Sequence, residues 1–290
     1  MLDYRLVQAL DAVLTQGGFE KAAQSLYLTQ SAVSRRIKQL EAQLGQMVLQ
    51  RTTPPKATLA GQRLLHHYQQ VRQMEAALGL SSADEKQSIR LAMNADSLAT
   101  WVTEALLLPD HPGVRFDLVV EDQSVGLNRM KQGDVMACIC ASPEAVNGGA
   151  VVALGALRYR AVASPAFIRR YQLDSASPAQ LASLPCLVFN EDDQLQHLYL
   201  RQYCGELPQH IHYCPSSEGF LKACLAGLGY GLLPELQMQQ EFAEGRLVDL
   251  SPQLYLDVPL YWHHWQTESP LLQQLREQVQ QVATKTLRHL

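Results

Sequence analysis

The chain has no long uninterrupted apolar run, although 47% of its 290 residues are hydrophobic. A membrane-spanning helix needs about 18–20 consecutive apolar residues, so the sequence predicts no membrane span. The first residues, Met1-Leu2-Asp3-Tyr4-Arg5, also lack the charged and apolar regions of a signal peptide. We therefore expect a folded, cytoplasmic protein without a membrane partner.

Motifs of enzymes and cofactor-binding proteins are absent as well. The sequence contains no GxGxxG, HExxH or GxSxG, the motifs of dinucleotide-binding folds, zinc proteases and α/β-hydrolases. Its six cysteines include no CxxC pair, and buried, reduced thiols are the expectation for a cytosolic chain of this length. We predict no catalytic residues, no resident metal and no cofactor.

Charge is sparse and unevenly distributed. Charged residues make up 18% of the chain, and the net charge of −4 by itself argues against a nucleic-acid partner. Residues 1–79, however, hold nine basic and five acidic side chains, whereas the remainder holds 15 basic and 23 acidic ones. A basic head on an acidic body indicates a DNA-binding module joined to a domain with another task.

The first 45 residues show the pattern of three successive helices. Apolar residues at helical spacing predict a helix over 4–16, which Gly17-Gly18 would end, and a short second helix over about 20–26. Thr29 is a candidate N-cap for a third helix that runs to about Leu44, and Gly45 follows where a C-terminal glycine belongs.

The third helix has two contrasting faces. Its apolar residues recur at positions 33, 37, 40 and 44, whereas Ser31, Ser34, Arg35 and Lys38 form a polar and basic face on another side. An ordinary amphipathic helix with a solvated charged side would show the same periodicity. The neighbouring glycines, the small pair Ala22-Ala23 and the wing-like segment Arg51–Lys56 favour a helix-turn-helix that lays this face in the major groove.

The rest of the chain has a different pattern of apolar and polar residues. A long helical stretch over about 58–78 is followed by the polar segment 80–88, which we interpret as a hinge. Short apolar runs then alternate with helical patterns, which predicts a mostly parallel α/β sheet in two lobes with a cleft between them. The predicted strands are 89–93, 114–120, 134–140, 159–163, 186–189, 211–213, 230–233 and 258–262.

The segment Phe19–Arg51, FEKAAQSLYLTQSAVSRRIKQLEAQLGQMVLQR, followed by TLAG at Thr58–Gly61, closely resembles the winged helix-turn-helix of LysR-type transcription regulators. The resemblance implies a regulator that binds an inverted-repeat operator in double-stranded DNA as a homodimer or homotetramer and contacts RNA polymerase. It also implies a set of DNA-binding residues in the third helix and the wing. These are Gln30, Ser31, Ser34, Arg35, Lys38, Arg51 and Lys56.

The same resemblance implies a domain order. A winged helix-turn-helix (1–60) would lead through a dimerisation helix (58–79) and the hinge to a two-lobed effector-binding domain (89–290) of the type 2 periplasmic-binding-protein fold. The first lobe would comprise about 89–160 and 264–290, and the second about 161–263. A helix from about Thr267 to Leu290 would return onto the first lobe.

Shorter strings indicate a branch of the family. NADSLATW at Asn94–Trp101, VED at Val120–Asp122, SSE at Ser216–Glu218, YWH at Tyr261–His263 and RTTPP at Arg51–Pro55 resemble the ArgP/LysG branch. Members of that branch, also described as inhibitors of chromosome initiation, respond to lysine or arginine and control amino-acid export. The resemblance therefore implies a basic amino acid as the effector.

Residues suited to such a ligand lie at predicted strand ends, where free backbone N–H groups bind anions and nearby carboxylates bind cations. Each could instead only cap a helix or face water. The candidate effector-binding residues are Ser97, Thr100, Asp122, Ser217 and Glu218, with Asp96 and Glu121 as alternates.

One segment departs from the branch. An acidic residue is expected near Arg158, and Arg160 adds a second positive charge two residues later. If this segment shapes the cleft, its charge opposes a cationic effector. Otherwise, these two arginines are surface residues.

The effector could also be a different small metabolite, and two other functions compete with amino-acid sensing. His210, His212 and Cys214 fall on one face of a predicted strand, with Cys204 nearby, and could sense a soft metal or redox state. The two lobes also suit a solute-binding protein, although the missing signal peptide and the basic head argue against that function.

Overall fold

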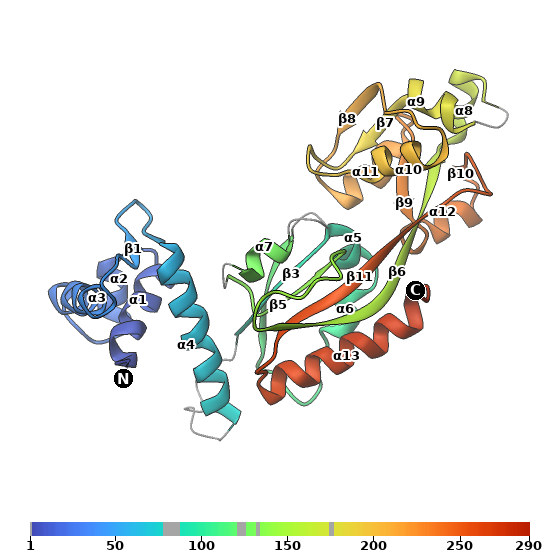
Figure 1. Cartoon of the computed structure of the whole chain (residues 1–290). Coiled ribbons are helices and arrows are strands. Elements are labelled where there is room, and N and C mark those ends of the chain that lie inside the picture. Colours follow the sequence, from blue (N-terminus) through green and yellow to red (C-terminus); the bar gives the residue numbers. More distant parts are fainter. Residues whose placement is uncertain (1, 78–87, 121–125, 132–133, 174–176) are drawn as a thin grey trace.

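The computed structural model describes residues 2–77, 88–120, 126–131, 134–173 and 177–290 (Figure 1). Most of the predicted hinge 80–88 therefore lies outside the described residues, as do Glu121 and Asp122.

The head (residues 2–77) begins with three helices around one apolar core. They are α1 (Tyr4–Thr15), α2 (Phe19–Ser25) and α3 (Gln30–Leu44). The Thr29 side chain accepts a hydrogen bond from the Ala32 amide at 3.2 Å, and Gly45 ends α3 in the left-handed region with φ 67°. Val33, Ile37 and Leu40 of α3 are buried against α1 and α2. Both the capping and the inward face are as the sequence predicts.

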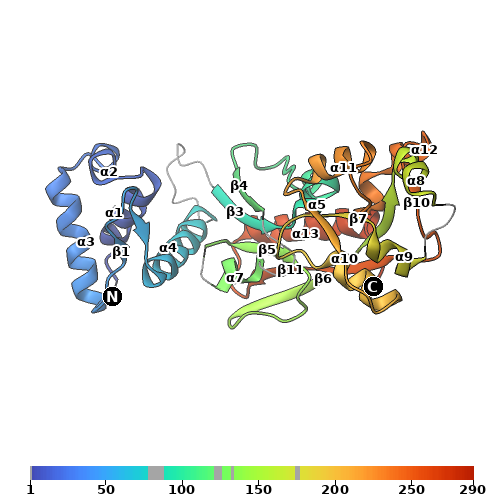
Figure 2. The same cartoon turned by 90° about the horizontal axis from the view of Figure 1, so that it is seen from above.

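A small wing follows the third helix. Strands β1 (Leu49–Gln50) and β2 (Lys56–Ala57) pair antiparallel and lead into the long helix α4 (Leu59–Ala77). Gly61 lies so close to the Val48 carbonyl that a Cβ there would overlap its oxygen. This close approach fixes the wing against the start of α4. Seen from above, α3 lies on the outer side of the head and α4 on the opposite side (Figure 2).

The first lobe is a mixed sheet flanked by helices. Parallel strands β3, β4 and β5 lie side by side, and β11 continues the sheet antiparallel to β5. The apolar residues of β3 and β5 are buried on both faces. The elements are β3 (Ser88–Met93), α5 (Ala95–Thr100), α6 (Val102–Ala105), β4 (Arg115–Val120), α7 (Gly126–Lys131), β5 (Ala137–Cys140), β11 (Leu256–Trp265) and α13 (Pro270–Thr286).

The second lobe is built around the far end of β6 (Gly149–Ala163). This strand pairs antiparallel with β9 and β10, and a bridge between Cys186 and Tyr230 connects β9 to the parallel pair β7–β8. The remaining elements are α8 (Pro165–Tyr171), α9 (Pro178–Ser183), β7 (Pro185–Val188), α10 (Leu195–Tyr203), β8 (His210–Tyr213), α11 (Ser217–Leu225), β9 (Gly231–Pro234), η1 (Glu235–Gln237), α12 (Gln239–Ala243) and β10 (Val248–Asp249).

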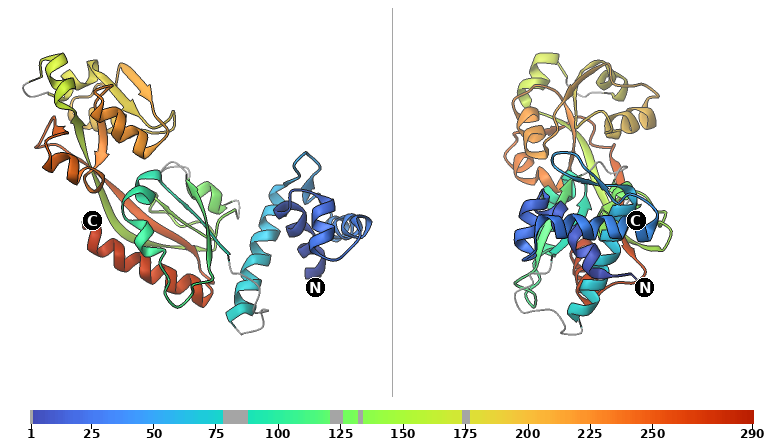
Figure 3. Two further views of the ribbon diagram at one scale, coloured as in Figure 1. Left: turned by 180° about the vertical axis from the view of Figure 1, so that it is seen from behind. Right: turned by 90° about the vertical axis from the view of Figure 1, so that its left-hand side faces the viewer.

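Two long strands join the lobes. β6 and β11 pair antiparallel from Gly149–Trp265 to Tyr159–Leu256, and they cross from one lobe to the other (Figure 3). The predicted lobe boundaries at 160–161 and 263–264 thus fall inside continuous strands. The first ten residues of β6, 149–158, and all of β10 are absent from the strands that we predicted. Helix α13 packs on α6 and β6, as expected for a helix that returns to the first lobe.

The fold is that of a two-lobed, periplasmic-binding-protein-like domain behind a winged helix-turn-helix. None of the helices that the structure describes is both long and apolar enough to cross a membrane.

Candidate functional site

The polar face of α3 is open to solvent. Gln30, Ser31, Arg35 and Lys38 are exposed, and Ser34 is half-buried. The first turn is ordered by its cap, since the Thr29 and Ser31 hydroxyls lie 3.0 Å apart in a hydrogen bond. Hydroxyl, amide and guanidinium groups on one accessible helix face can hydrogen-bond to base edges.

Two further basic residues lie on the wing. Arg51 directly follows β1 and Lys56 opens β2, and both side chains are exposed. In a winged helix-turn-helix such residues reach phosphates beside the groove that the recognition helix occupies. The structure therefore places all seven predicted DNA-binding residues on α3 or the wing.

A second candidate site is a pocket of about 480 Å³, including its opening to solvent, between α5 of the first lobe and the second lobe. Apolar side chains form most of its walls, and a few polar groups converge on it, which is typical of small-ligand sites. The lining residues are Asn94, Ala95, Asp96, Phe189, Asp193, Leu195, Ser217, Phe220, Leu232 and Leu233.

Asp96 connects the two lobes across this pocket. One carboxylate oxygen accepts a hydrogen bond from the Tyr159 hydroxyl at 2.8 Å, and the other accepts from the Ser217 hydroxyl at 2.9 Å. Ser217 begins α11 in the second lobe, and its carbonyl accepts from the Gln237 side chain at 3.0 Å. A ligand that competes for Asp96 or Ser217 would therefore alter the contact between the lobes.

Two more polar groups meet the pocket from opposite lobes. The buried Asp193 carboxylate accepts hydrogen bonds from the Phe189 and Leu195 amides, both at 2.9 Å. Asn94 precedes α5 and is 3% exposed, yet neither atom of its side-chain amide has a hydrogen-bond partner among the described residues. A buried amide without a partner is costly unless a ligand or water fills the place, so Asn94 is poised to bind one.

Only some of the predicted effector residues line the pocket. Ser217 and the alternate Asp96 line the pocket. Ser97 is fully buried in α5, and Thr100 donates its hydroxyl to the Asp96 carbonyl, so neither lines the pocket. Glu218 is exposed and pairs with Lys222 at 3.3 Å.

Sequence reasoning missed Asn94 and Asp193 as site residues. Both follow buried strands, β3 and β7, and the rule that ligands bind at the carboxyl ends of strands applies to both.

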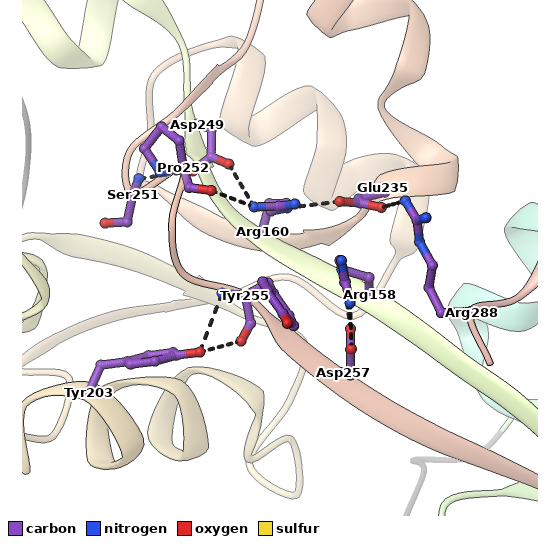
Figure 4. A network of polar contacts seen from close by, with 10 residues as sticks. All are labelled: Arg158, Arg160, Tyr203, Glu235, Asp249, Ser251, Pro252, Tyr255, Asp257 and Arg288. Carbon is purple, nitrogen blue, oxygen red and sulfur yellow. Dashed lines mark hydrogen bonds and ion pairs between the residues drawn. The ribbon is translucent and has the colours of Figure 1, made fainter. Parts of the chain in front are cut away.

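Arg158 and Arg160 lie outside the pocket, and they are not free surface residues (Figure 4). Arg158 makes a two-pronged ion pair with Asp257, with both N–O distances 2.7 Å, and lies over the Tyr255 ring. Arg160 pairs with Glu235 at 2.8 Å and donates to the Pro252 carbonyl. Their charges are neutralised where they stand, so they do not oppose a cation in the pocket.

Glu235 is the centre of this network. Its second carboxylate oxygen accepts from Arg288 at 2.8 Å, so one side chain links β6, η1 and the carboxyl-terminal segment. Burial alone would raise the pKa of Glu235, but the hydrogen bonds from Arg288 and Arg160 outweigh it and hold the pKa below its ordinary value.

The proposed metal cluster does not assemble among the described residues, where no three His, Cys, Asp or Glu side chains are placed to hold an ion. His210 and His212 are exposed on β8, and Cys214 is half-buried. All six cysteines are free, and four of them are buried. The thiols therefore match the expectation of reduced, mostly buried cysteines.

Comparison with known proteins identifies the two halves of the chain. Residues 4–62 match the family model of the bacterial regulatory helix-turn-helix protein of the lysR family, and residues 82–284 match the LysR substrate binding domain. The chain belongs to the LysR family. It is therefore a DNA-binding transcription regulator and not an enzyme, as the sequence predicted.

Individual relatives confirm the resemblance to the ArgP and LysG branch. The chain is 51% identical over 287 residues to the transcriptional regulator ArgP of Pseudomonas fluorescens Pf0-1, covering 96% of each protein. It is similar to the crystal structure of ArgP from Mycobacterium tuberculosis, with 35% identity, a TM-score of 0.86 and full coverage of both chains. It is also similar to full-length LysG from Corynebacterium glutamicum with bound effector Arg, with 31% identity, a TM-score of 0.75 and coverage of 99% and 100%.

Proposed function

We propose that this LysR-type regulator binds a basic amino acid, lysine or arginine, in the pocket between its lobes and thereby controls genes such as that of an amino-acid exporter. The observation that carries the proposal is the charge of the pocket. Asp96 and Asp193 line it from opposite lobes, and none of the described lining residues is Lys or Arg. The relative from Corynebacterium glutamicum with bound Arg supports the same ligand class.

The groups of the pocket suit the two ends of an amino acid. Carboxylates attract ammonium or guanidinium groups, and an amide such as Asn94 can donate to an α-carboxylate while accepting from an α-ammonium. Phe189, Leu195 and Phe220 offer apolar contact to the aliphatic part of the side chain. We assign Asn94, Asp96, Asp193 and Ser217 as effector-binding residues in place of Ser97, Thr100 and Glu218.

We further propose how the chain acts on DNA. Gln30, Ser31, Ser34, Arg35 and Lys38 would contact the major groove of an inverted-repeat operator, and Arg51 and Lys56 the flanking phosphates. Two copies joined through α4 would bind the two half-sites, as a homodimer or within a homotetramer in the cytoplasm. The effector would change the spacing of the heads, and with it DNA bending or contact with RNA polymerase.

A thermal-shift titration of the full chain tests the effector assignment. Lysine or arginine should raise Tm. Norleucine and citrulline keep the aliphatic part of these side chains but lack the side-chain cation, so they should not raise it. Asp193→Asn should abolish the shift. Glu218→Gln is the matched control and should keep the shift, because the Glu218 carboxylate belongs to the same lobe but is exposed and does not line the pocket. Equal shifts with lysine and norleucine would refute cation recognition.

Operator binding tests the DNA face. Arg35→Ala should weaken binding and relax the sequence preference at one position of the half-site, because it removes a base-reading group. Arg36→Ala is the matched control, since Arg36 lies next along α3 on the side of the buried residues 33, 37 and 40. If footprints of the two variants are the same, the assigned face is wrong.

A further inference from the structure

Tyr27, in the turn between α2 and α3, combines two features that are unfavourable for the stability of the fold. Its side chain is 96% exposed, the highest exposure among the large hydrophobic side chains that the structure describes as exposed. Its backbone has φ 54°, the left-handed region that L-residues other than Gly, Asn and Asp seldom occupy. A tyrosine here gains nothing from burial and strains the chain.

The turn requires this backbone conformation. The Leu28 amide donates to the Ala23 carbonyl at 2.8 Å, and the Tyr27 amide donates to the Gln24 carbonyl at 3.2 Å. This pair of bonds is the Schellman motif, in which the residue at the position of Tyr27 is usually glycine. Leu28 then packs against the head core. The fold thus demands a left-handed residue at position 27, but it does not demand a tyrosine.

The position of the turn supplies a reason for the side chain. Tyr27 stands three residues before Gln30, the first residue of α3, so the two are within about 10 Å along the chain. The amino-terminal residues of a recognition helix enter a major groove about 12 Å wide, bordered by phosphates. A side chain at this distance from a groove-reading residue is within reach of the phosphates that border the groove.

We propose that the Tyr27 hydroxyl donates a hydrogen bond to a DNA phosphate beside the half-site and so sets the register of α3 in the groove. The inference rests on the proposed DNA face of α3 and extends it by a neutral contact that carries no sequence information. A tyrosine suits this role because its ring keeps the hydroxyl at a fixed distance from a backbone that the Schellman bonds hold in place. It thereby positions the neighbouring base-reading residues.

Tyr27→Gly separates the two roles of the residue, because glycine adopts the left-handed backbone without strain. The variant should keep a Tm at or above that of the wild type and bind DNA about three- to tenfold more weakly at each head. These affinities are measured on a DNA duplex that the wild-type full chain has selected from a random pool. Tyr27→Phe should lose a similar factor in affinity with an unchanged Tm.

The chain offers a matched control in the second lobe. Gln172 ends α8 with φ 52°, and the amides of Gln172 and Leu173 make the same two bonds. Gln172→Gly should therefore also preserve Tm but leave DNA affinity unchanged. The slope of log affinity against log salt should not change in the Tyr27 variants, because a phenol displaces no counterion, whereas Lys56→Ala should reduce it by about 1.

The outcomes separate this inference from the proposed DNA face. If Tyr27→Gly and Tyr27→Phe bind as tightly as the wild type while Arg35→Ala binds weakly, the phosphate contact of Tyr27 is refuted and the face of α3 stands. If Arg35→Ala also binds as the wild type, the assigned face itself is wrong. A Tyr27→Gly variant with weaker binding but a clearly lower Tm would show that Tyr27 stabilises the fold, and would overturn the proposal.

Discussion

At the scale of single residues, the unpaired amide of Asn94 is the clearest indication that the pocket binds a ligand. Its side chain is buried at the start of α5, neither of its polar atoms has a hydrogen-bond partner among the described residues, and it does not cap α5. Natural proteins rarely leave a buried amide unpaired, because its desolvation costs about 1–3 kcal/mol. The unpaired amide of Asn94 therefore lowers the stability of the ligand-free chain, and hydrogen bonds to a bound amino acid would offset this cost.

Asn94→Leu tests whether this amide lowers stability and binds the effector. The variant keeps the branched shape and the number of side-chain heavy atoms and removes the unpaired amide, and the pocket beside it leaves room for the larger methyl groups. Its free energy of unfolding in the absence of amino acids should therefore stay equal or rise by about 1 kcal/mol. Lysine or arginine should bind about tenfold more weakly. Urea unfolding and calorimetric titration measure the two quantities, and a large loss of stability would mean that the amide is satisfied within the protein.

At the scale of elements, Gly61 decides how the wing meets α4. Gly61→Ala should destabilise the head by about 1–3 kcal/mol, because a methyl group there overlaps the Val48 carbonyl oxygen and the backbone must shift. Gly18→Ala is the control, since nothing lies near its added methyl group and its φ of 171° is extended. Thermal unfolding of the two variants checks the difference, and equal Tm values would contradict the close approach.

The charged network at the crossing of β6 and β11 makes a second prediction for elements. Because Glu235 has a lowered pKa in the folded chain, it stabilises the fold above the ordinary pKa of 4.5, and this contribution is lost as the pH falls through the lowered value. Glu235→Gln should cost on the order of 1.5 kcal/mol at neutral pH and should flatten the acid limb of the stability profile.

Urea unfolding between about pH 7 and about pH 3 measures both effects. Glu218→Gln, with its exposed carboxylate, serves as the control and should follow the wild type. A Glu235→Gln variant that loses stability with acid as steeply as the wild type would show that Glu235 does not hold this network together.

At the scale of the whole molecule, the pocket and the DNA face are linked only if the lobes adopt different arrangements with and without effector. Asp96, Tyr159 and Ser217 form the contact that a ligand in the pocket would disturb. By thermodynamic reciprocity, the factor by which lysine changes operator affinity must equal the factor by which the operator changes lysine affinity.

We expect this factor to be about tenfold. Fluorescence titrations of operator with and without lysine, and of lysine with and without operator, measure it from both sides. Ser217→Ala should reduce it toward 1, because the variant lacks the hydroxyl that bonds to Asp96. A Ser217→Ala variant with wild-type coupling would remove the lobe contact from the mechanism.

Much of the fold could be predicted because it depends on short stretches of sequence. The caps of α3, the two faces of that helix and most strands of the lobes follow from spacing and turn residues within a few positions of one another. Residues 149–158 of β6 escaped prediction, since Gly149–Ala156 shows little alternation and becomes a strand only by pairing with β11. The wing positions of Arg51 and Lys56 came from family resemblance.

The sequence by itself determined the head and the family, because a helix-turn-helix is local and its exposed face can be read from residues 30–38. Only the tertiary structure decided what the cleft offers. Asp193 and Ser217 follow Asn94 in the sequence by about 100 and about 120 residues. The three residues meet because β6 and β11 carry the chain across both lobes. Likewise Arg158 is neutralised by Asp257, its direct partner in the register of those strands. Such pairings depend on how distant segments align, which no spacing in the sequence records.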